Sequence, residues 1–242
     1  MRRIWIIAVI LLAGCASRLT LQLESSLDLQ RDVYQREIEA AIGEAMARFS
    51  EHGFALARRE VLDSAYVFAT RDSGRRQVAA HFGVAPEAIP ETFFGTVDGK
   101  NLFIVAPDAY EQSFRELYGE ETWSPQEHQK AIVHELIHRL HAMVAVERFA
   151  TEEGMGPQWF FEGLAIRLSN QFAPAPGTPE PLTWDEIAQL IEQDAAGQLR
   201  PPVYPIYGRI IRSLERRVPI RWMIEHAYDP DFVAQLGERY QS

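Results

Sequence analysis

The 242-residue chain contains a single cysteine, which excludes an intrachain disulfide framework and any zinc or iron–sulfur site built from several cysteines. It has no excess of positive charge, because 24 Lys and Arg stand against 34 Asp and Glu, for a formal net charge of −10. Nucleic-acid-binding proteins normally present a basic face, so we expect no nucleic-acid partner. The apolar run Ile4–Leu12 has only about half of the roughly 20 residues that a membrane-spanning helix needs.

The composition is that of a soluble globular protein, with 47% hydrophobic and 24% charged residues. It excludes wholesale disorder, a collagen-like fibre and a polytopic membrane protein. At about 150 residues per domain, the length fits one large domain or two small ones. Because the sequence shows no internal repeat and no long linker, we expect residues 31–242 to form a single domain.

The first fifteen residues have the pattern of a targeting segment. Arg2 and Arg3 precede the apolar run Ile4–Leu12, as in a secretory signal peptide. The run ends in Leu12-Ala13-Gly14-Cys15, which resembles a bacterial lipobox. The resemblance implies that residues 1–14 are a lipoprotein signal peptide and that Cys15 becomes the lipidated N-terminus. The alternative is an ordinary signal peptide with an incidental cysteine.

The lipobox resemblance also implies where the protein resides. A lipidated Cys15 would anchor the chain to a membrane of the bacterial envelope. Ala16 follows the cysteine where Asp would be an inner-membrane signal, so the sequence is similar to lipoproteins sorted to the outer membrane and facing the periplasm. We expect residues 15–30 to form a tether between the anchor and the domain.

The remaining pattern predicts an α+β fold that is rich in helices and has a small mixed sheet. Val, Tyr, Phe and Thr are frequent in residues 61–70, which favours a strand, and residues 93–105 resemble a hairpin with its turn at 98–101. Ser124 and Glu127 have the spacing of a capping box that opens a helix to about Phe149. Proline-rich residues 173–181 predict a loop. Further helices are expected at 32–49, from a Thr183–Glu186 capping box to about 195, and at about 203–217, 219–227 and 230–240.

The long helix contains the sequence His134-Glu135-Leu136-Ile137-His138, an HExxH motif. Residues i and i+4 project from one face of a helix, so the two imidazoles can converge on one metal ion. Glu135 lies about 100° around the helix, where its carboxylate can reach a water on that metal without displacing a ligand. The face through the two histidines is polar and the opposite face is apolar, which predicts that the helix packs through its apolar face and carries the site on its polar face.

A third ligand is needed to complete such a site. Metzincins supply a histidine six residues after the second, but Val144 stands at that position. His141 lies on the same face and is interpreted as a histidine that packs beside the ligands. Glu162 is the better candidate, because it is the only acid in the apolar stretch Pro157–Ala165 and a buried carboxylate needs a partner. The alternative for Glu162 is a half-exposed helix residue, and the small Gly163 should let its segment approach the HExxH helix closely.

The combination of HExxH with Trp159-x-x-Glu162-Gly163-x-Ala165 resembles the gluzincin metallopeptidases, most closely the compact peptidase MA-like group. The match extends over residues 125 to 215. It implies a zincin-like fold with the sheet packed on the HExxH helix. It also implies one Zn²⁺ per chain, held by His134, His138 and Glu162, with Glu135 as the general base. The implied activity is hydrolysis of peptide bonds in envelope peptides or proteins by a zinc-activated water.

The same resemblance implies a hydrogen-bond donor for the oxyanion, downstream of the third ligand. Tyr204 begins Tyr-x-x-x-Gly-Arg-Ile-Ile-x-x-Leu, which is similar to a helix of the compact relatives. Tyr207 lies one turn further and is its rival, and either residue can instead be a core tyrosine. His226 is interpreted as a surface residue.

Two further expectations concern the substrate and the alternative function. An extended peptide could pair with a sheet edge beside the HExxH helix, and Phe93–Val97 is the candidate edge. The alternative function is a catalytically silent zincin-like envelope lipoprotein that acts as a binding or assembly module.

Overall fold

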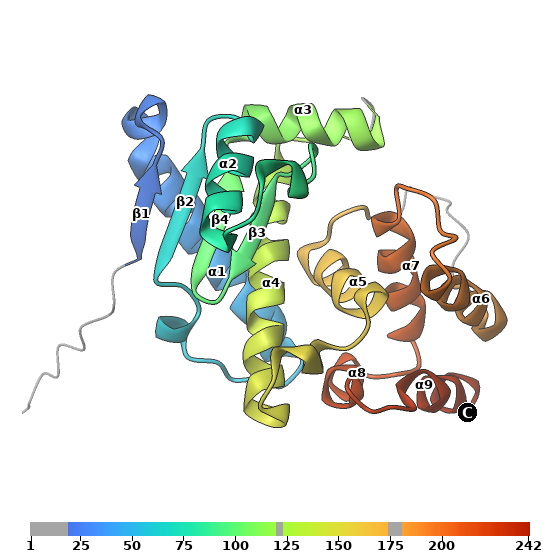
Figure 1. The fold of residues 1–242 in the computed structure, drawn as a ribbon. Helices are drawn as coiled ribbons and strands as arrows, with labels where there is room; N and C mark the ends of the chain where they lie inside the picture. The colour runs from blue at the N-terminus through green and yellow to red at the C-terminus, as the bar shows by residue number, and fades with distance from the viewer. Residues whose placement is uncertain (1–18, 120–122, 174–180) are drawn as a thin grey trace, which may run out of the picture.

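The computed structural model describes residues 19–119, 123–173 and 181–242, which form nine α-helices and a four-stranded sheet (Figure 1). The α+β prediction is confirmed. The signal peptide 1–14, Cys15 and most of the proline-rich loop lie outside the described residues. Within the described part of the chain, no helix is both long and apolar enough to cross a membrane.

The sheet is mixed, as expected, and has the order β1-β2-β4-β3. Its strands are β1 (Thr20–Leu23), β2 (Ser64–Phe68), β3 (Gly95–Asp98) and β4 (Asn101–Val105). β1, β2 and β4 run parallel, whereas β3 pairs antiparallel with β4 through the turn at residues 99–100. The predicted hairpin is therefore confirmed, and β3 lies at one edge of the sheet.

Helices cover both faces of the sheet. Leu102 and Ile104 of β4 belong to the same core cluster as apolar residues of α1 (Arg31–Glu51) and α4 (Gln126–Phe149). Phe103 and Val105 point to the other face, where they pack with residues of α2 (Arg71–Phe82) and α3 (Pro107–Tyr118). This alternation is the two-residue period of a strand that is buried on both sides.

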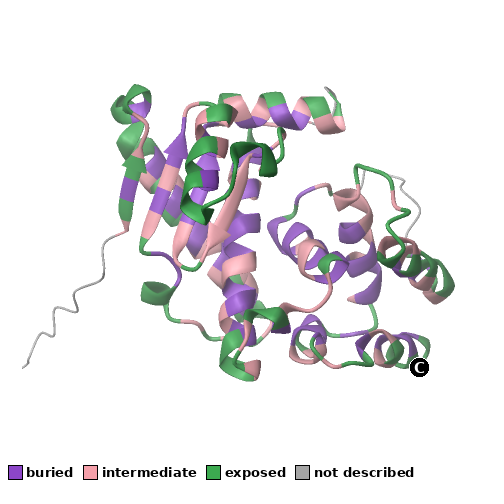
Figure 2. Cartoon of the chain, viewed as in Figure 1, coloured by how far each residue is buried: buried purple, intermediate pink, exposed green. Residues whose placement is uncertain are grey.

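The rest of the chain forms a helical layer on the far side of α4 (Figure 1). It consists of α5 (Gln158–Ser169), α6 (Trp184–Ala195), α7 (Tyr204–Leu214), α8 (Ile220–His226) and α9 (Phe232–Gln241). α4 thus lies between the sheet and this layer, and buried residues occur along most of its length (Figure 2). The apolar face packs in the main core cluster, as predicted, and the face through His134 and His138 is also largely buried.

Several predicted helix boundaries are confirmed. The capping box at Thr183 and Glu186 is formed: the Thr183 side chain accepts from the Glu186 backbone N–H, and the Glu186 carboxylate accepts from the Thr183 backbone N–H. At the start of α4 the prediction is wrong in detail. The Ser124 hydroxyl donates to the Glu127 carboxylate at 3.1 Å, and Pro125 stands at the cap position.

The N-terminal tether is shorter than predicted. Residues 20–23 pair with β2, and residues 25–30 form the 3₁₀ helix η1, which leads directly into α1. Leu21 and Leu27 are buried in the main core cluster. A four-residue strand with two apolar positions is too short for its pattern to be recognised, so the sequence alone suggested a linker.

Candidate metal centre

Three side chains from two helices meet between the sheet layer and the helical layer. His134 and His138 extend from adjacent turns of α4, and Glu162 extends from α5. Nε2 of His138 lies 3.0 Å from Nε2 of His134. Oε2 of Glu162 lies 3.2 Å from Nε2 of His134 and 3.3 Å from Nε2 of His138. The structure thus brings together the three residues that the sequence predicted as ligands.

This triangle of atoms has the dimensions of a metal site. Two imidazole nitrogens and one carboxylate oxygen lie within 4.8 Å of one another and could hold a metal ion. For a tetrahedral ion with bonds of about 2.0–2.1 Å, neighbouring ligand atoms are about 3.3 Å apart. The observed separations of 3.0 to 3.3 Å agree with that edge length.

The electrostatics of the cluster also favour a bound cation. Burial alone would raise the pKa of Glu162, but His138 and His134 beside it hold the pKa well below its ordinary value. Burial would lower the pKa of His138, yet the Glu162 carboxylate raises it above the ordinary value. A buried carboxylate that stays ionised attracts positive charge. A bound metal ion can provide that charge in place of a proton on the neighbouring histidines.

Glu135 is not part of the triangle but lies beside it. Its side chain is buried, with 7% of the residue exposed, and burial raises the pKa of its carboxyl despite the opposing effect of His134 and His138. Across from it, a Cβ built on Gly95 of β3 would lie 3.4 Å from Cγ of Glu135. The Glu135 side chain therefore lies against the start of β3, at the edge of the sheet.

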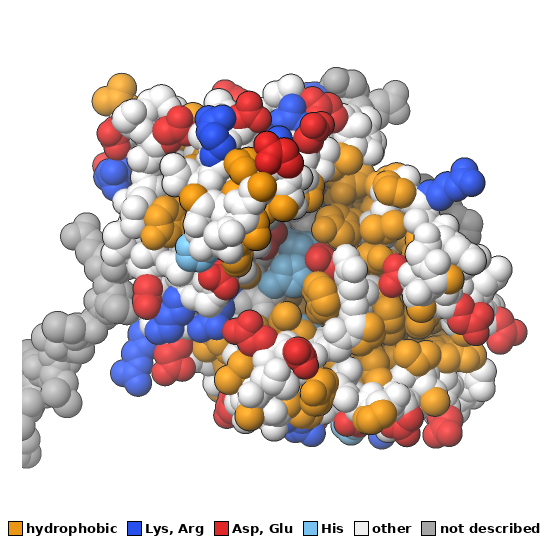
Figure 3. Space-filling model, in the orientation of Figure 1, with side chains coloured by type: hydrophobic (Ala, Val, Ile, Leu, Met, Phe, Trp, Pro, Cys, Tyr) orange, Lys and Arg blue, Asp and Glu red, His pale blue; other side chains and the backbone are white. Residues whose placement is uncertain are grey.

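The cluster opens onto a cleft of about 690 Å³ that is lined by β3, α4, α5 and the start of α7. In the space-filling view, histidine side chains are visible at the base of a hollow, with hydrophobic side chains on both sides (Figure 3). His134, Glu135, His138 and Glu162 all line this cleft. The side chains able to bind a metal are thus accessible to a molecule of the size of a peptide segment.

The structure separates the two candidate tyrosines. Tyr204 lines the cleft, and its ring centroid lies 6.2 Å from that of His134. Burial, and next the nearby Glu162 carboxylate, raise the pKa of the Tyr204 phenol, so the hydroxyl stays protonated as a donor. Tyr207 is buried in the core, and its hydroxyl donates to Asp194 of α6.

His226 lies outside the cleft lining, in α8. Its ring stacks on Trp222 with centroids 4.3 Å apart, and it is half-buried rather than fully exposed.

His141 lies one turn beyond His138 and is 1% exposed. Neither ring nitrogen has a hydrogen-bond partner among the described residues, and the ring packs edge-on against Phe160 at 5.7 Å between centroids. Burial, with a smaller contribution from His138, lowers the pKa of His141 to about 3. His141 is therefore a neutral ring in an apolar setting, and it does not belong to the three-residue cluster that could hold a metal.

The variant His141→Leu is expected to keep the metal content of the wild-type chain and its stability at neutral pH. In the wild type, the unfolded chain protonates this histidine below its ordinary pKa of 6.5, whereas the folded chain does not. The free energy of unfolding of the wild type therefore falls as the pH drops from 6.5 towards about 3. The leucine variant should lose less stability over the same pH range, because it has no histidine to protonate at this position. Urea unfolding of both metal-free proteins at pH 7 and at a mildly acidic pH measures the difference. Loss of metal at pH 7 in the variant would instead identify His141 as a ligand.

Sequence reasoning missed one side chain of the cleft and misplaced another contact. Tyr118, the last residue of α3, lines the cleft; burial and then Glu162 raise its pKa. The spacing of Tyr110, Phe114 and Tyr118 at every fourth residue was a signal for this helix.

Gly163 does not face α4 as predicted. A Cβ built on Gly163 would lie 2.7 Å from the carbonyl oxygen of Tyr207, so the glycine permits close packing of α5 on α7.

Comparison of the chain with protein-family models, with curated proteins and with solved structures gave no match in any of the three.

Proposed function

We propose that this protein is a zinc-dependent metallopeptidase of the gluzincin type. The observation that supports this most is the triangle of His134, His138 and Glu162 with Glu135 beside it, at the base of an open cleft. Two imidazoles and one carboxylate form a common ligand set of catalytic zinc, which leaves a position for a reactant. The same ligand set also binds ferrous iron in oxygenases. We favour a hydrolase because Glu135 places a carboxylate beside the ligands, where it can act as a general base.

The residues of the chain have separate tasks in this proposal. Zinc bound by the cluster would act as a Lewis acid and lower the pKa of water towards about 7. Glu135 accepts a proton as water attacks the peptide carbonyl, and then delivers that proton to the leaving amine. Burial raises the pKa of Glu135, which makes it a better acceptor than an exposed carboxylate. The Tyr204 hydroxyl donates a hydrogen bond to the oxygen on which negative charge develops.

The free edge of β3 is the proposed docking site for the substrate backbone. Within the described residues β3 pairs only with β4, so its other edge faces the cleft. An extended peptide can add to such an edge through backbone hydrogen bonds, as a further strand. The strand begins at Gly95, next to Glu135, and this would bring a bound peptide bond to the general base.

We also propose that the protein works in the bacterial envelope. A lipid on Cys15 would attach it to the outer membrane, with the folded domain facing the periplasm. Because β1 starts at Thr20, only residues 16–19 would separate the anchor from the folded domain. Four residues span at most about 14 Å, so the domain would remain next to the membrane surface.

The variant Tyr204→Phe is expected to lower kcat for peptide hydrolysis by about 10- to 100-fold while KM and zinc content stay unchanged. Tyr207→Phe is the matched control, because the same hydroxyl is removed one helical turn away. It breaks the bond to Asp194 and should cost about 1 kcal/mol of stability without changing kcat. Steady-state kinetics and urea unfolding of both variants check this assignment. A larger loss of kcat in Tyr207→Phe would reverse it.

The activity itself is tested by incubating the zinc-loaded protein with a reduced, unfolded polypeptide in H₂¹⁸O. Mass spectrometry should find new carboxyl termini that contain ¹⁸O, because hydrolysis transfers an oxygen from water to the acyl carbon. A chelator should abolish these products and added zinc should restore them. The absence of new termini with zinc-loaded protein counts against the peptidase.

A further inference from the structure

We propose that the cleft selects polypeptide segments with bulky apolar side chains, and that the flank formed by α2, by the segment after the 3₁₀ helix η3 (Pro86–Ala88) and by β3 makes this selection. The inference rests on the proposed function, because it names the class of substrate that reaches the metal cluster. Hereafter "the apolar flank" means six of the apolar side chains that line the cleft on the β3 side: Val78, Phe82, Ile89, Pro90, Phe93 and Val97.

The apolar flank presents hydrophobic surface to solvent beside the site. Phe82 is 47% exposed although it is a large aromatic residue at the end of α2. Ile89 is half-buried and Pro90 is exposed, whereas Val78 and Phe93 are buried beneath them. Exposed apolar surface that is contiguous with a cleft marks a binding site more often than isolated apolar residues do. Hydrophobic side chains border the hollow in the space-filling view (Figure 3).

The position of the apolar flank fits an extended polypeptide. It adjoins β3, whose free edge can pair with a backbone, and successive side chains of an extended strand point to opposite sides. Alternate side chains of a chain paired with β3 would therefore be directed towards this flank. The metal cluster lies further along the same cleft, so one bound segment can contact both.

Two of the charged side chains that line the cleft already have polar partners. Asp98, at the end of β3, is paired with His81 of α2 at 2.7 Å. Arg139 lines the cleft but donates to the backbone carbonyls of Val61 and Glu60 at 3.1 and 3.0 Å. Both charged groups already have partners, so neither provides a dedicated site for a charged substrate side chain.

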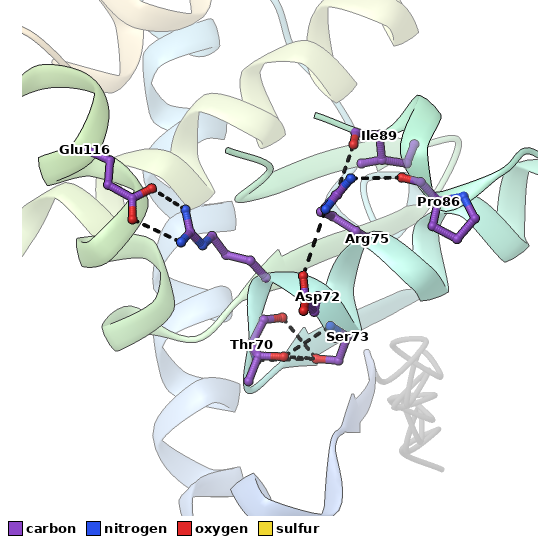
Figure 4. A network of polar contacts seen from close by, with 8 residues as sticks. Thr70, Asp72, Ser73, Arg75, Pro86, Ile89 and Glu116 are labelled. Atoms are coloured by element: carbon purple, nitrogen blue, oxygen red, sulfur yellow. Dashed lines mark hydrogen bonds and ion pairs between the residues drawn. The ribbon is translucent and has the colours of Figure 1, made fainter. Parts of the chain in front are cut away.

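Polar contacts hold the elements that carry the apolar flank (Figure 4). Arg75 of α2 donates to the carbonyl oxygens of Ile89 at 3.0 Å and Pro86 at 3.3 Å, which fixes η3 against α2. Arg71 forms a bidentate ion pair with Glu116, which fixes α2 to α3. A surface that is already ordered loses little conformational entropy when a ligand binds.

The test measures peptide binding to the zinc-loaded chain with the substitution Glu135→Gln, so that the probe is not cleaved. The probes are two fluorescein-labelled peptides of equal length and charge, one with leucine and one with serine at alternate positions. We expect the leucine peptide to bind about tenfold more tightly by fluorescence anisotropy, as is typical when an apolar group is added to an apolar site.

Substitutions in the apolar flank then locate the preference. Phe82→Ser and Ile89→Ser, each added to the Glu135→Gln chain, should reduce the leucine preference severalfold and leave serine-peptide binding unchanged. Val84→Ser is the matched control, because Val84 is 45% exposed, lies two residues after Phe82 and does not line the cleft. Equal binding of the two peptides, or a preference that survives both flank substitutions, overturns the inference. Thermal unfolding verifies that the substituted chains are folded.

Cleavage by the chain with Glu135 intact separates this inference from the proposed function. If the leucine peptide binds through Phe82 and Ile89 but is never cleaved, the apolar flank is supported and the peptidase is not. If both peptides bind equally and are cleaved equally, the peptidase is supported and the apolar flank is rejected.

Discussion

Replacing Glu135 by glutamine will abolish peptide hydrolysis and leave the metal content of the chain unchanged. The amide is nearly the same size as the carboxylate, so the contact of this side chain with Gly95 of β3 is kept. It cannot accept the proton of the attacking water, however, and proton transfer by a positioned side chain contributes about 10²- to 10⁴-fold to the rate. Glu135 is not one of the three clustered ligands, so zinc should remain bound.

The matched control is Glu147→Gln, which makes the same change at an exposed position of the same helix. It should retain wild-type kcat, KM and zinc content. Undiminished turnover of Glu135→Gln, with contaminating peptidases excluded, would remove this residue from the mechanism. In cells, the phenotype of Glu135→Gln can be compared with that of a deletion. If only the deletion has a phenotype, the alternative of a catalytically silent binding or assembly module is favoured.

Replacing Glu162 by alanine will weaken zinc binding by about 100- to 1,000-fold. Zinc binding at structural sites contributes about 10–16 kcal/mol, so one ligand of four contributes roughly 2.5–4 kcal/mol, which is close to that range. The variant leaves the two imidazole nitrogens 3.0 Å apart but removes the only carboxylate oxygen in the triangle. It also removes the negative charge that raises the pKa of His138, so protons compete less for that site but the metal loses its anionic ligand.

Competition with a chromophoric chelator measures this affinity. Glu152→Ala is the control, because Glu152 lines the same cleft but is not part of the triangle. It removes one negative charge from the cleft and should change zinc affinity less than about threefold, as expected for an exposed charge in water. Equal losses of zinc affinity in Glu162→Ala and Glu152→Ala would mean that the negative charge of the cleft, and not coordination by Glu162, causes the effect.

The HExxH part of the site was predictable because its geometry is local. The i, i+4 spacing fixes where His134 and His138 point as soon as the segment is helical, and α4 has the predicted extent. Glu162 was predictable for a different reason: a lone acid in an apolar stretch needs a partner. Its meeting with the two histidines depends on the packing of α5 on α4, and no local pattern encodes that packing.

The choice between Tyr204 and Tyr207 illustrates what the sequence leaves open. The two lie on successive turns of one helix, so only the rotation of α7 decides which one faces the cleft. That rotation is fixed by close contact between α5 and α7, where a Cβ on Gly163 or Gly208 would lie within 2.8 Å of the opposite helix. The sequence shows two glycines, but their partners become apparent only when both helices are in place.

The sheet was harder to predict than the site. β1 is four residues long, and its pairing partner β2 begins more than forty residues later, so neither length nor period identifies it. α2 was missed because it is mostly polar, and α3 was missed although Tyr110, Phe114 and Tyr118 recur at every fourth residue. Both helices are placed by the aromatic cluster on the outer face of the sheet, which is a tertiary contact.

The most direct test of this account is the metal content of the purified wild-type chain, determined by elemental mass spectrometry after desalting. We expect about one zinc per chain, because the proposed catalytic site is single and has three protein ligands. A chain that holds no zinc even after reconstitution, or that holds iron in its place, would contradict the proposal of a zinc metallopeptidase.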